Sequence, residues 1–259
     1  MHRNEFFWGG ALVVAGLLLL LGTVFEINVW ILIGPLALIA VGVWIIWGVY
    51  GRPAATAEPA AVPLAGAQRA RIEVHHGAGR LAIGSGAEPG NLLDGTFSGG
   101  VQCEARGEGD GMQVQLRVPG SSLPWVWGSP GLAWNLRLSP KVPLELKLET
   151  GGNEALVDLT DLQVVDLRLS TGASSTEVLL PARAGFTRVK VGAGVATVRL
   201  RAPEGVAVKF EFEGGLATAH VDTGRFPRAG DEYCSPDYAT AANKVDIEVE
   251  AGVGSVDLR

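Results

Sequence analysis

Two adjacent histidines, His75 and His76, are the first residues of the chain that could bind a metal or exchange a proton near neutral pH. They lie in Arg71-Ile-Glu-Val-His-His76, where apolar and polar residues alternate as in a β-strand. Successive side chains of a strand point to opposite faces, so these two imidazoles cannot chelate one ion together. The chain also lacks the Cys-x-x-Cys and His-x-x-x-His spacings that supply zinc ligands. We therefore expect no metal and no cofactor.

Catalytic groups are also not gathered in the sequence. Cys103 has no evident histidine partner that would activate a thiolate. A glycosidase or lyase built from stacked β-strand repeats would need carboxylates collected on one flank of the stack. The carboxylates expected at outward strand positions are instead scattered: Asp158, Asp166, Glu177 and Asp257. The glycine-rich run at 192–196 lacks the following helix that a phosphate-binding loop requires. The sequence predicts a protein that is not an enzyme.

Three tryptophans, Trp125, Trp127 and Trp134, form the most distinctive group of side chains outside the repeats described below. The first two lie in the turn-rich segment 119–130. One interpretation is a lid over an open end of the core, because stacked repeats need a cap. The other is an interaction surface, because tryptophan is enriched in binding hot spots.

The elements that would position these residues are short repeated strands. The stretch Leu144-Glu-Leu-Lys-Leu-Glu-Thr-Gly151 alternates strictly, and similar stretches recur at 165–172, 187–192, 207–214 and 244–252. Their glycines at 151, 172, 192 and 214 are spaced by 21, 20 and 22 residues. A repeat of roughly 20 residues with two short strands is typical of a β-solenoid. A plain antiparallel meander or sandwich is the alternative.

This pattern predicts an all-β head over residues 69–259, with an irregular part at 69–143 and repeats at 144–259. Stacking would align one inward residue per repeat into a continuous core: Leu146, Leu167, Val189, Phe210 and Ile247. The glycines would form corners with positive φ, and an insertion would occupy 222–243. The last strand, 255–259, has no evident cap and would leave an exposed edge.

The N-terminal part reads as a membrane anchor. Residues 6–24 and 29–50 contain no charged side chain, and roughly 20 apolar residues suffice for a helix to cross a bilayer core. We expect a two-helix hairpin over 1–51, rather than a cleaved signal peptide, followed by an extended Pro/Ala-rich linker at 52–68.

Charge suggests an orientation and excludes one class of partner. Arg3 and Arg52 flank the hairpin and Glu26 lies in its turn, which favours a cytoplasmic head over an extracellular one. The chain has a formal net charge of −6 and no basic run, so nucleic acid is not an expected partner. Cys103 and Cys234 could form one disulfide outside the cell or remain two thiols inside it.

Six stretches along the chain carry a family resemblance: Phe6-Phe-Trp-Gly-Gly10, Gly95-Thr-Phe-Ser-Gly99, Trp134-Asn-Leu-Arg-Leu-Ser-Pro140, 142–152, 214–219 and 243–254. Taken in this order, they resemble the LiaF-type family of bacterial cell-envelope stress regulators and the related toast-rack β-solenoid domains. The resemblance covers nearly the whole chain. It implies a non-catalytic protein, and better-studied members of that family hold a sensor kinase in check at the membrane.

Two functions remain in view. The first is a membrane-anchored regulatory module that binds a sensor kinase or another envelope protein. The second is a structural or adhesin-like scaffold that self-associates into homo-oligomers through the edges of its solenoid. In both, the lipid bilayer is a partner of the N-terminal hairpin.

Overall fold

The computed structural model describes residues 57–119 and 132–259, which belong to one compact unit that spans Ala54–Arg259. Every regular element of this described part is a β-strand, so the all-β prediction is confirmed there. None of the residues that it covers forms a helix long and apolar enough to span a membrane. The two spans expected at 6–24 and 29–50 lie outside the described residues.

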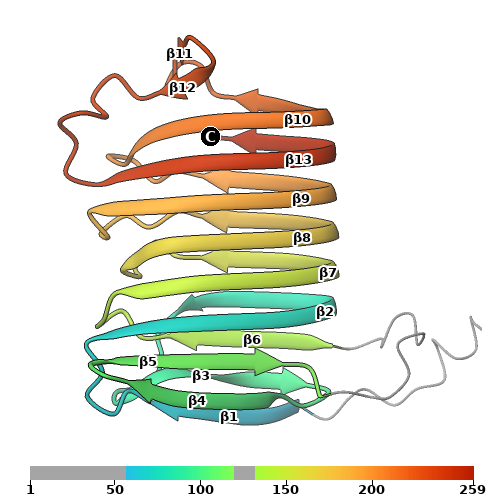
Figure 1. Cartoon of the computed structure of the whole chain (residues 1–259), viewed down its shortest axis with the longest axis vertical. Helices are drawn as coiled ribbons and strands as arrows, with labels where there is room; N and C mark the ends of the chain where they lie inside the picture. The colour runs from blue at the N-terminus through green and yellow to red at the C-terminus, as the bar shows by residue number, and fades with distance from the viewer. Residues whose placement is uncertain (1–56, 120–131) are drawn as a thin grey trace, which may run out of the picture. The chain divides into compact units, whose positions relative to one another are not determined.

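Figure 1 shows the strands as a ladder of stacked windings. In chain order they are β1 (Ala57–Pro63), β2 (Arg69–Ser85), β3 (Asn91–Ser98), β4 (Gln102–Glu108), β5 (Gly111–Arg117), β6 (Ala133–Leu138), β7 (Leu144–Asp158), β8 (Val164–Leu179), β9 (Phe186–Arg201), β10 (Ala207–Val221), β11 (Arg228–Ala229), β12 (Glu232–Cys234) and β13 (Lys244–Leu258).

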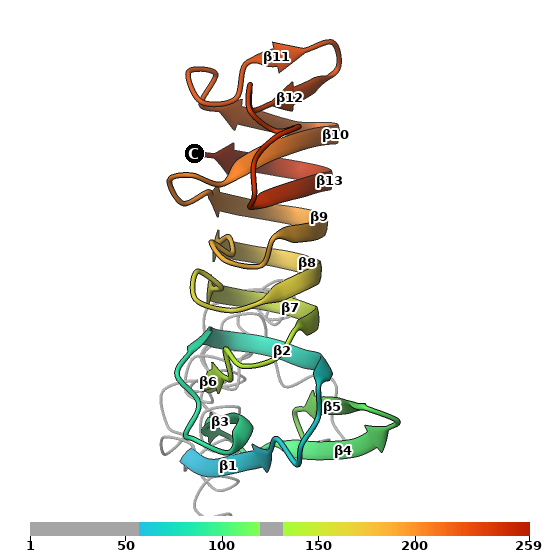
Figure 2. The ribbon, with the colours of Figure 1, turned by 90° about the vertical axis from the view of Figure 1, so that its left-hand side faces the viewer.

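The long strands β2, β7, β8, β9, β13 and β10 are the windings, and each pairs in parallel with its neighbours in the stack. Each winding has two arms that meet at a corner, and a turn leads from the end of the second arm to the next winding (Figure 2). The two arms thus form two layers that face each other. This is the solenoid arrangement that the repeat predicts.

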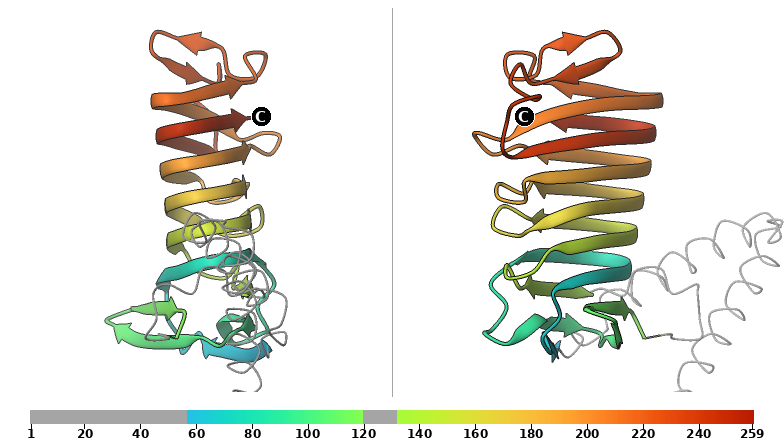
Figure 3. Two further views of the ribbon diagram at one scale, coloured as in Figure 1. Left: turned by 90° about the vertical axis from the view of Figure 1, so that its right-hand side faces the viewer. Right: turned by 60° about the vertical axis from the view of Figure 1, so that its left-hand side comes forward.

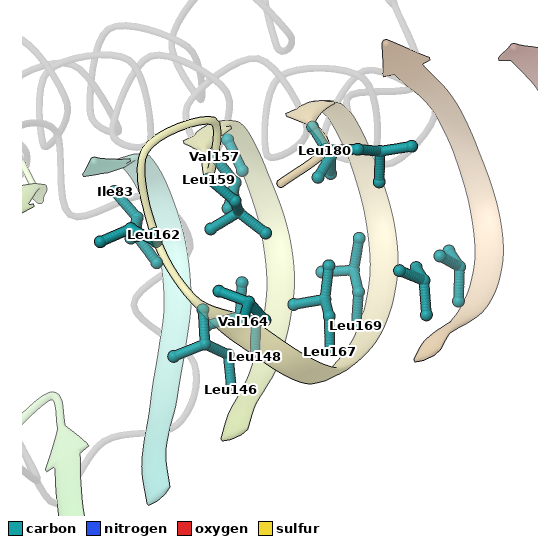
Figure 4. Close-up of a cluster of buried hydrophobic side chains, with 14 of the residues drawn as sticks. Ile83, Leu146, Leu148, Val157, Leu159, Leu162, Val164, Leu167, Leu169 and Leu180 are labelled. Atoms are coloured by element: carbon teal, nitrogen blue, oxygen red, sulfur yellow. The ribbon is translucent and has the colours of Figure 1, made fainter. Parts of the chain in front are cut away.

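Hydrophobic side chains alternate inward along both arms and fill the space between the layers. The predicted core column is confirmed: Leu146 pairs with Leu167, Leu167 with Val189, Val189 with Ile247, and Ile247 with Phe210. These five side chains are at most 2% exposed. In Figure 4, inward residues of one arm face those of the other, with Leu146 and Leu167 on one side and Val157 and Leu180 opposite. One winding cannot bury these groups without its neighbours.

The windings do not stack in chain order. β13 lies between β9 and β10 and pairs with both along its whole length, so the C-terminal residue lies within the stack rather than at its end (Figure 1). The expectation that 255–259 forms an exposed edge is therefore wrong. The insertion predicted at 222–243 lets the chain pass beyond β10 and return, and it carries β11 and β12.

At the opposite end of the stack β5 and β6 pair with β2 in parallel, and antiparallel strands then close the end. β5 continues the first-arm layer next to β2, with β4 as its hairpin partner. β6 continues the second-arm layer, followed by β3 and β1. The segment expected as a linker, 52–68, thus contains the strand β1, whose Val62 is buried in the core. The proline and alanine content of this segment favoured a linker over a strand. Proline is tolerated here because β1 is an edge strand.

Glycine forms the corners, but for a reason other than the predicted positive φ. The residues aligned at the corner are Gly77, Gly151, Gly172, Gly194, Gly252 and Gly215, and none of them has a positive φ. Close approach explains all of them except Gly77, where an added Cβ would meet no heavy atom within 4 Å: a Cβ on Gly172 would lie 3.1 Å from the carbonyl oxygen of Gly151, and one on Gly252 would lie 2.8 Å from that of Gly194. Gly192 and Gly214, predicted as corners, lie one or two residues before the aligned positions.

Candidate interaction surface

The two histidines lie on opposite faces of β2, as the alternation predicts. His75 points outward, where its Nδ1 lies 2.8 Å from Oε2 of Glu149. Lys147 lies 2.7 Å from the other carboxylate oxygen, and these contacts lower the pKa of Glu149, the hydrogen bond from Lys147 contributing most. The cluster borders a shallow hollow of about 650 Å³ over the corner glycines. The cluster contains a carboxylate and an imidazole, but Glu149 is engaged with both His75 and Lys147.

His76 points inward and is 1% exposed. Its ring packs edge-on against Trp134, with the ring centroids 5.2 Å apart. Neither ring nitrogen has a hydrogen-bond partner within the described residues. Burial lowers its pKa from 6.5 to about 4, because the charged imidazolium would lose its hydration. His76 is therefore a neutral core residue at physiological pH.

The remaining chemistry-bearing residues stay separate in space. Among residues 57–119 and 132–259, no three His, Cys, Asp or Glu side chains are arranged to hold a metal ion. Asp166 pairs with Arg168 at 3.1 Å, and Glu177 pairs with Arg201 at 2.7 Å. Asp158 accepts a hydrogen bond from the backbone N–H of Thr160. These carboxylates serve local pairing on the outer faces of the windings.

Both cysteines are free thiols. Cys103 lies on β4 and Cys234 on β12, at opposite ends of the stack (Figure 1). They cannot form a disulfide with each other within one chain. Burial raises the pKa of both thiols, which makes them less reactive than an ordinary cysteine.

Of the three tryptophans predicted as an interaction surface, the structure describes Trp134 alone. Trp134 lies on β6, is 1% exposed, and packs against Phe97 as well as His76. Trp134 is therefore a core residue and cannot contribute to an exposed interaction surface. Trp125 and Trp127 lie outside the described residues.

An apolar ridge runs along the outside of the corners instead. Directly after each corner glycine, the last windings place an apolar residue that points into solvent, and ladder pairing aligns these residues: Ala173, Val195, Val253 and Leu216. Val195 is 62% exposed and Leu216 is 83% exposed. Isolated exposed apolar residues are common, but an aligned row on adjacent strands is typical of a contact surface.

The ridge ends at a free strand edge, formed by Gly215–Val221 of β10. One side of this segment pairs with β13. On the other side β12 pairs only with Lys209 and Phe210, and no described strand pairs with Gly215–Val221 (Figure 3). Its inward residues Ala219 and Val221 are only half-buried, whereas their counterparts Val256 and Leu258 on β13 are at most 1% exposed. The core is therefore uncovered at this point.

Within the described residues, the two edges at the opposite end of the stack, β1 and β4, are protected against pairing. β1 carries Pro59 and Pro63, which lack a backbone donor, and β4 carries the exposed charges Glu104 and Arg106. Proline and charge are the usual means by which edge strands avoid association. The free edge of β10 has neither proline nor a formal charge between Gly214 and Val221.

Comparison with known proteins identifies this architecture. The family model for the N-terminal domain of toast-rack proteins, DUF2154, matches residues 52–218. The chain belongs to this toast-rack family. Its fold is also similar to the crystal structure of a Clostridium sporogenes protein provisionally assigned to cell adhesion, with a TM-score of 0.73 and 22% sequence identity over 79% of this chain and 98% of that one. At that identity, the similarity concerns the fold. No curated protein matches the sequence significantly.

The toast-rack match ends within β10, close to the middle of the free edge. Residues after this point form the cap strands β11 and β12 and the inserted winding β13. Sequence reasoning missed both the ridge and the free edge. The ridge did have a signal, because Gly194-Val195, Gly252-Val253 and Gly215-Leu216 repeat the same glycine–apolar pair. The free edge had none, because strand order is not encoded in a local pattern.

Proposed function

We propose that this toast-rack protein is non-catalytic and that it binds another protein through the end of its stack, at the free edge of β10 and the adjoining apolar ridge. We place this activity at the bacterial membrane, where the N-terminal hairpin would anchor a cytoplasmic head, and in the regulation of the cell-envelope stress response through a sensor kinase.

The observation that carries the proposal is the combination of two features at one place. A strand edge offers backbone donors and acceptors that a partner strand can satisfy, which is a recurrent mode of peptide recognition. Leu216 belongs to both the edge and the ridge and is 83% exposed, so apolar contact and backbone pairing would reinforce each other. The resemblance to LiaF-type regulators supplies the membrane location and the kinase.

The test is a deletion strain that carries an envelope-stress reporter and is complemented with variants of the full chain. Leu216→Asp would remove the proposed contact. Leu156→Asp is the matched control, because Leu156 is also an exposed leucine, at 49%, on the outer face of β7 away from the free edge. We expect deletion to raise the reporter, the control to restore repression, and Leu216→Asp to fail. A reporter that does not respond to deletion would overturn the regulatory role.

The second candidate is an adhesin-like or structural scaffold that self-associates. The unprotected edge favours it as well, because such an edge can pair with another copy. The fold similarity to a protein provisionally assigned to cell adhesion is consistent with this candidate. A deletion strain that loses cell–cell or envelope cohesion while its stress reporter stays unchanged would favour the scaffold.

A further inference from the structure

We propose that the free edge of β10 pairs with the same edge of a second copy of this chain, antiparallel and across a two-fold axis. This inference rests on the proposed function in one respect: it takes the β10 end as the site of protein contact, but it names a second copy of this chain, in place of a different protein, as the occupant of the edge.

The backbone argument starts from hydrogen bonding. Along Gly215–Val221 only the β13 side of the strand is paired within the described residues. A strand from a second copy would continue the second-arm layer and complete the ladder. It would also cover Ala219 and Val221, which are half-buried now and would join the core of the stack.

The side chains of this segment are compatible with antiparallel pairing to the same segment of a second copy. Pairing over the whole of Gly215–Val221 places Thr218 on the two-fold axis and sets Leu216 opposite His220. Inward residues then face inward residues, with Ala217 opposite Ala219, because residues that pair across this axis lie on the same face. No two like charges oppose each other, since the segment has no formally charged residue.

The remaining edges argue against a different arrangement. Head-to-tail stacking would need β10 to pair with β1 or β4, and those edges carry Pro59, Pro63, Glu104 and Arg106. An isologous pair uses the unprotected edge of β10 twice and closes after two copies, whereas a head-to-tail contact would generate a fibre. The structure thus favours a closed dimer.

The experiment substitutes Thr218, the residue on the two-fold axis, with a positively charged residue in one variant and a negatively charged residue in another. The full chain is purified in a mild detergent, and the protein mass of the complex is measured by light scattering over a range of concentrations. Thr218→Lys and Thr218→Glu each set like charges opposite each other in a dimer. The matched control is Ser175→Lys, because Ser175 is an exposed outward residue in the same ladder column, on the interior winding β8.

We expect a dimer for the wild type and for Ser175→Lys. Each Thr218 variant should raise the dimer dissociation constant by roughly fivefold or more, and an equimolar mixture of the two should restore dimers. A monomeric wild type, unchanged dimers in both Thr218 variants, or a mixture that stays monomeric would each overturn self-pairing. If self-pairing fails while Leu216→Asp still abolishes repression, the edge binds a different protein and the proposed function stands.

Discussion

The backbone carbonyl oxygen of Gly77 lies directly against Gly151, in the place where the Cβ of any larger residue would stand. The relationship repeats up the stack, where a Cβ on Gly194 would lie 3.1 Å from the carbonyl oxygen of Gly172. The corner is narrow because windings are separated only by the ladder spacing of about 4.8 Å. Glycine at the corner is therefore a packing requirement.

The first prediction concerns this column. Gly151→Ala should lower the free energy of unfolding by about 1–3 kcal/mol, because the methyl group forces the β2 and β7 backbones apart. Gly192→Ala is the matched control: it has no heavy atom within 4 Å of the added Cβ and does not have a positive φ. Denaturant unfolding of the full chain in detergent measures both. Equal losses at the two sites would contradict the packing explanation.

The glycines show which features of the fold could be predicted from the sequence and which could not. Alternation and a period near 21 residues sufficed to predict the solenoid, the inward column from Leu146 to Ile247 and the insertion before β13. The period did not reveal which glycine lies at the corner, because Gly192 and Gly194 are both compatible with alternation. The placement of β13 between β9 and β10, and hence the free edge, depends on long-range packing that no local pattern records.

Inward and outward positions should respond differently to substitution. Val189→Asp places a carboxylate in a site that is 0% exposed and should destabilise the stack by several kcal/mol, on the order of the cost of an unpaired buried charge. Lys190→Gln, next in the chain, removes only an exposed ion pair with Glu248 and should cost at most about 1 kcal/mol. The thermal unfolding midpoints of the two variants test the assignment of Val189 to the inward face and Lys190 to the outward face. Similar midpoints would show that this assignment is wrong.

Stability should fall on acidification because of His76. Its folded-state pKa of about 4 lies below the ordinary 6.5, so between these values the unfolded chain binds a proton that the folded chain does not. The free energy of unfolding should decrease as the pH drops from 6.5 to about 4, by about 3 kcal/mol in total. His76→Phe should remove this dependence, whereas His220→Phe, at an exposed position, should keep it. Parallel pH profiles for wild type and His76→Phe would refute the buried neutral histidine.

One ion pair should contribute to stability at the closed end of the stack. The buried Asp94 on β3 lies 2.6 Å from Nη2 of Arg137 on β6, and it also accepts a hydrogen bond from the backbone N–H of Glu88. Burial by itself would raise the pKa of Asp94, but that hydrogen bond and Arg137 together lower it. Its contribution should therefore be present above a pH of about 4 and be lost as the pH falls through the lowered pKa.

Asp94→Asn should thus cost about 2 kcal/mol at neutral pH. The matched control is Glu154→Gln, which removes the exposed pair between Arg80 and Glu154 at 3.4 Å and should cost about 0.5 kcal/mol or less. Urea midpoints at pH 7 and pH 3 measure both variants. A loss at Glu154 as large as that at Asp94 would show that burial does not distinguish the two pairs.

The most direct test of the central claim is photo-crosslinking in living cells, with a photoreactive amino acid at Leu216 or, as the control, at Leu156. If the β10 end of the stack is where this protein meets its partners, irradiation should yield defined protein adducts at Leu216 and few at Leu156. Adducts at Leu156 but not at Leu216, or none at either position, would contradict the account.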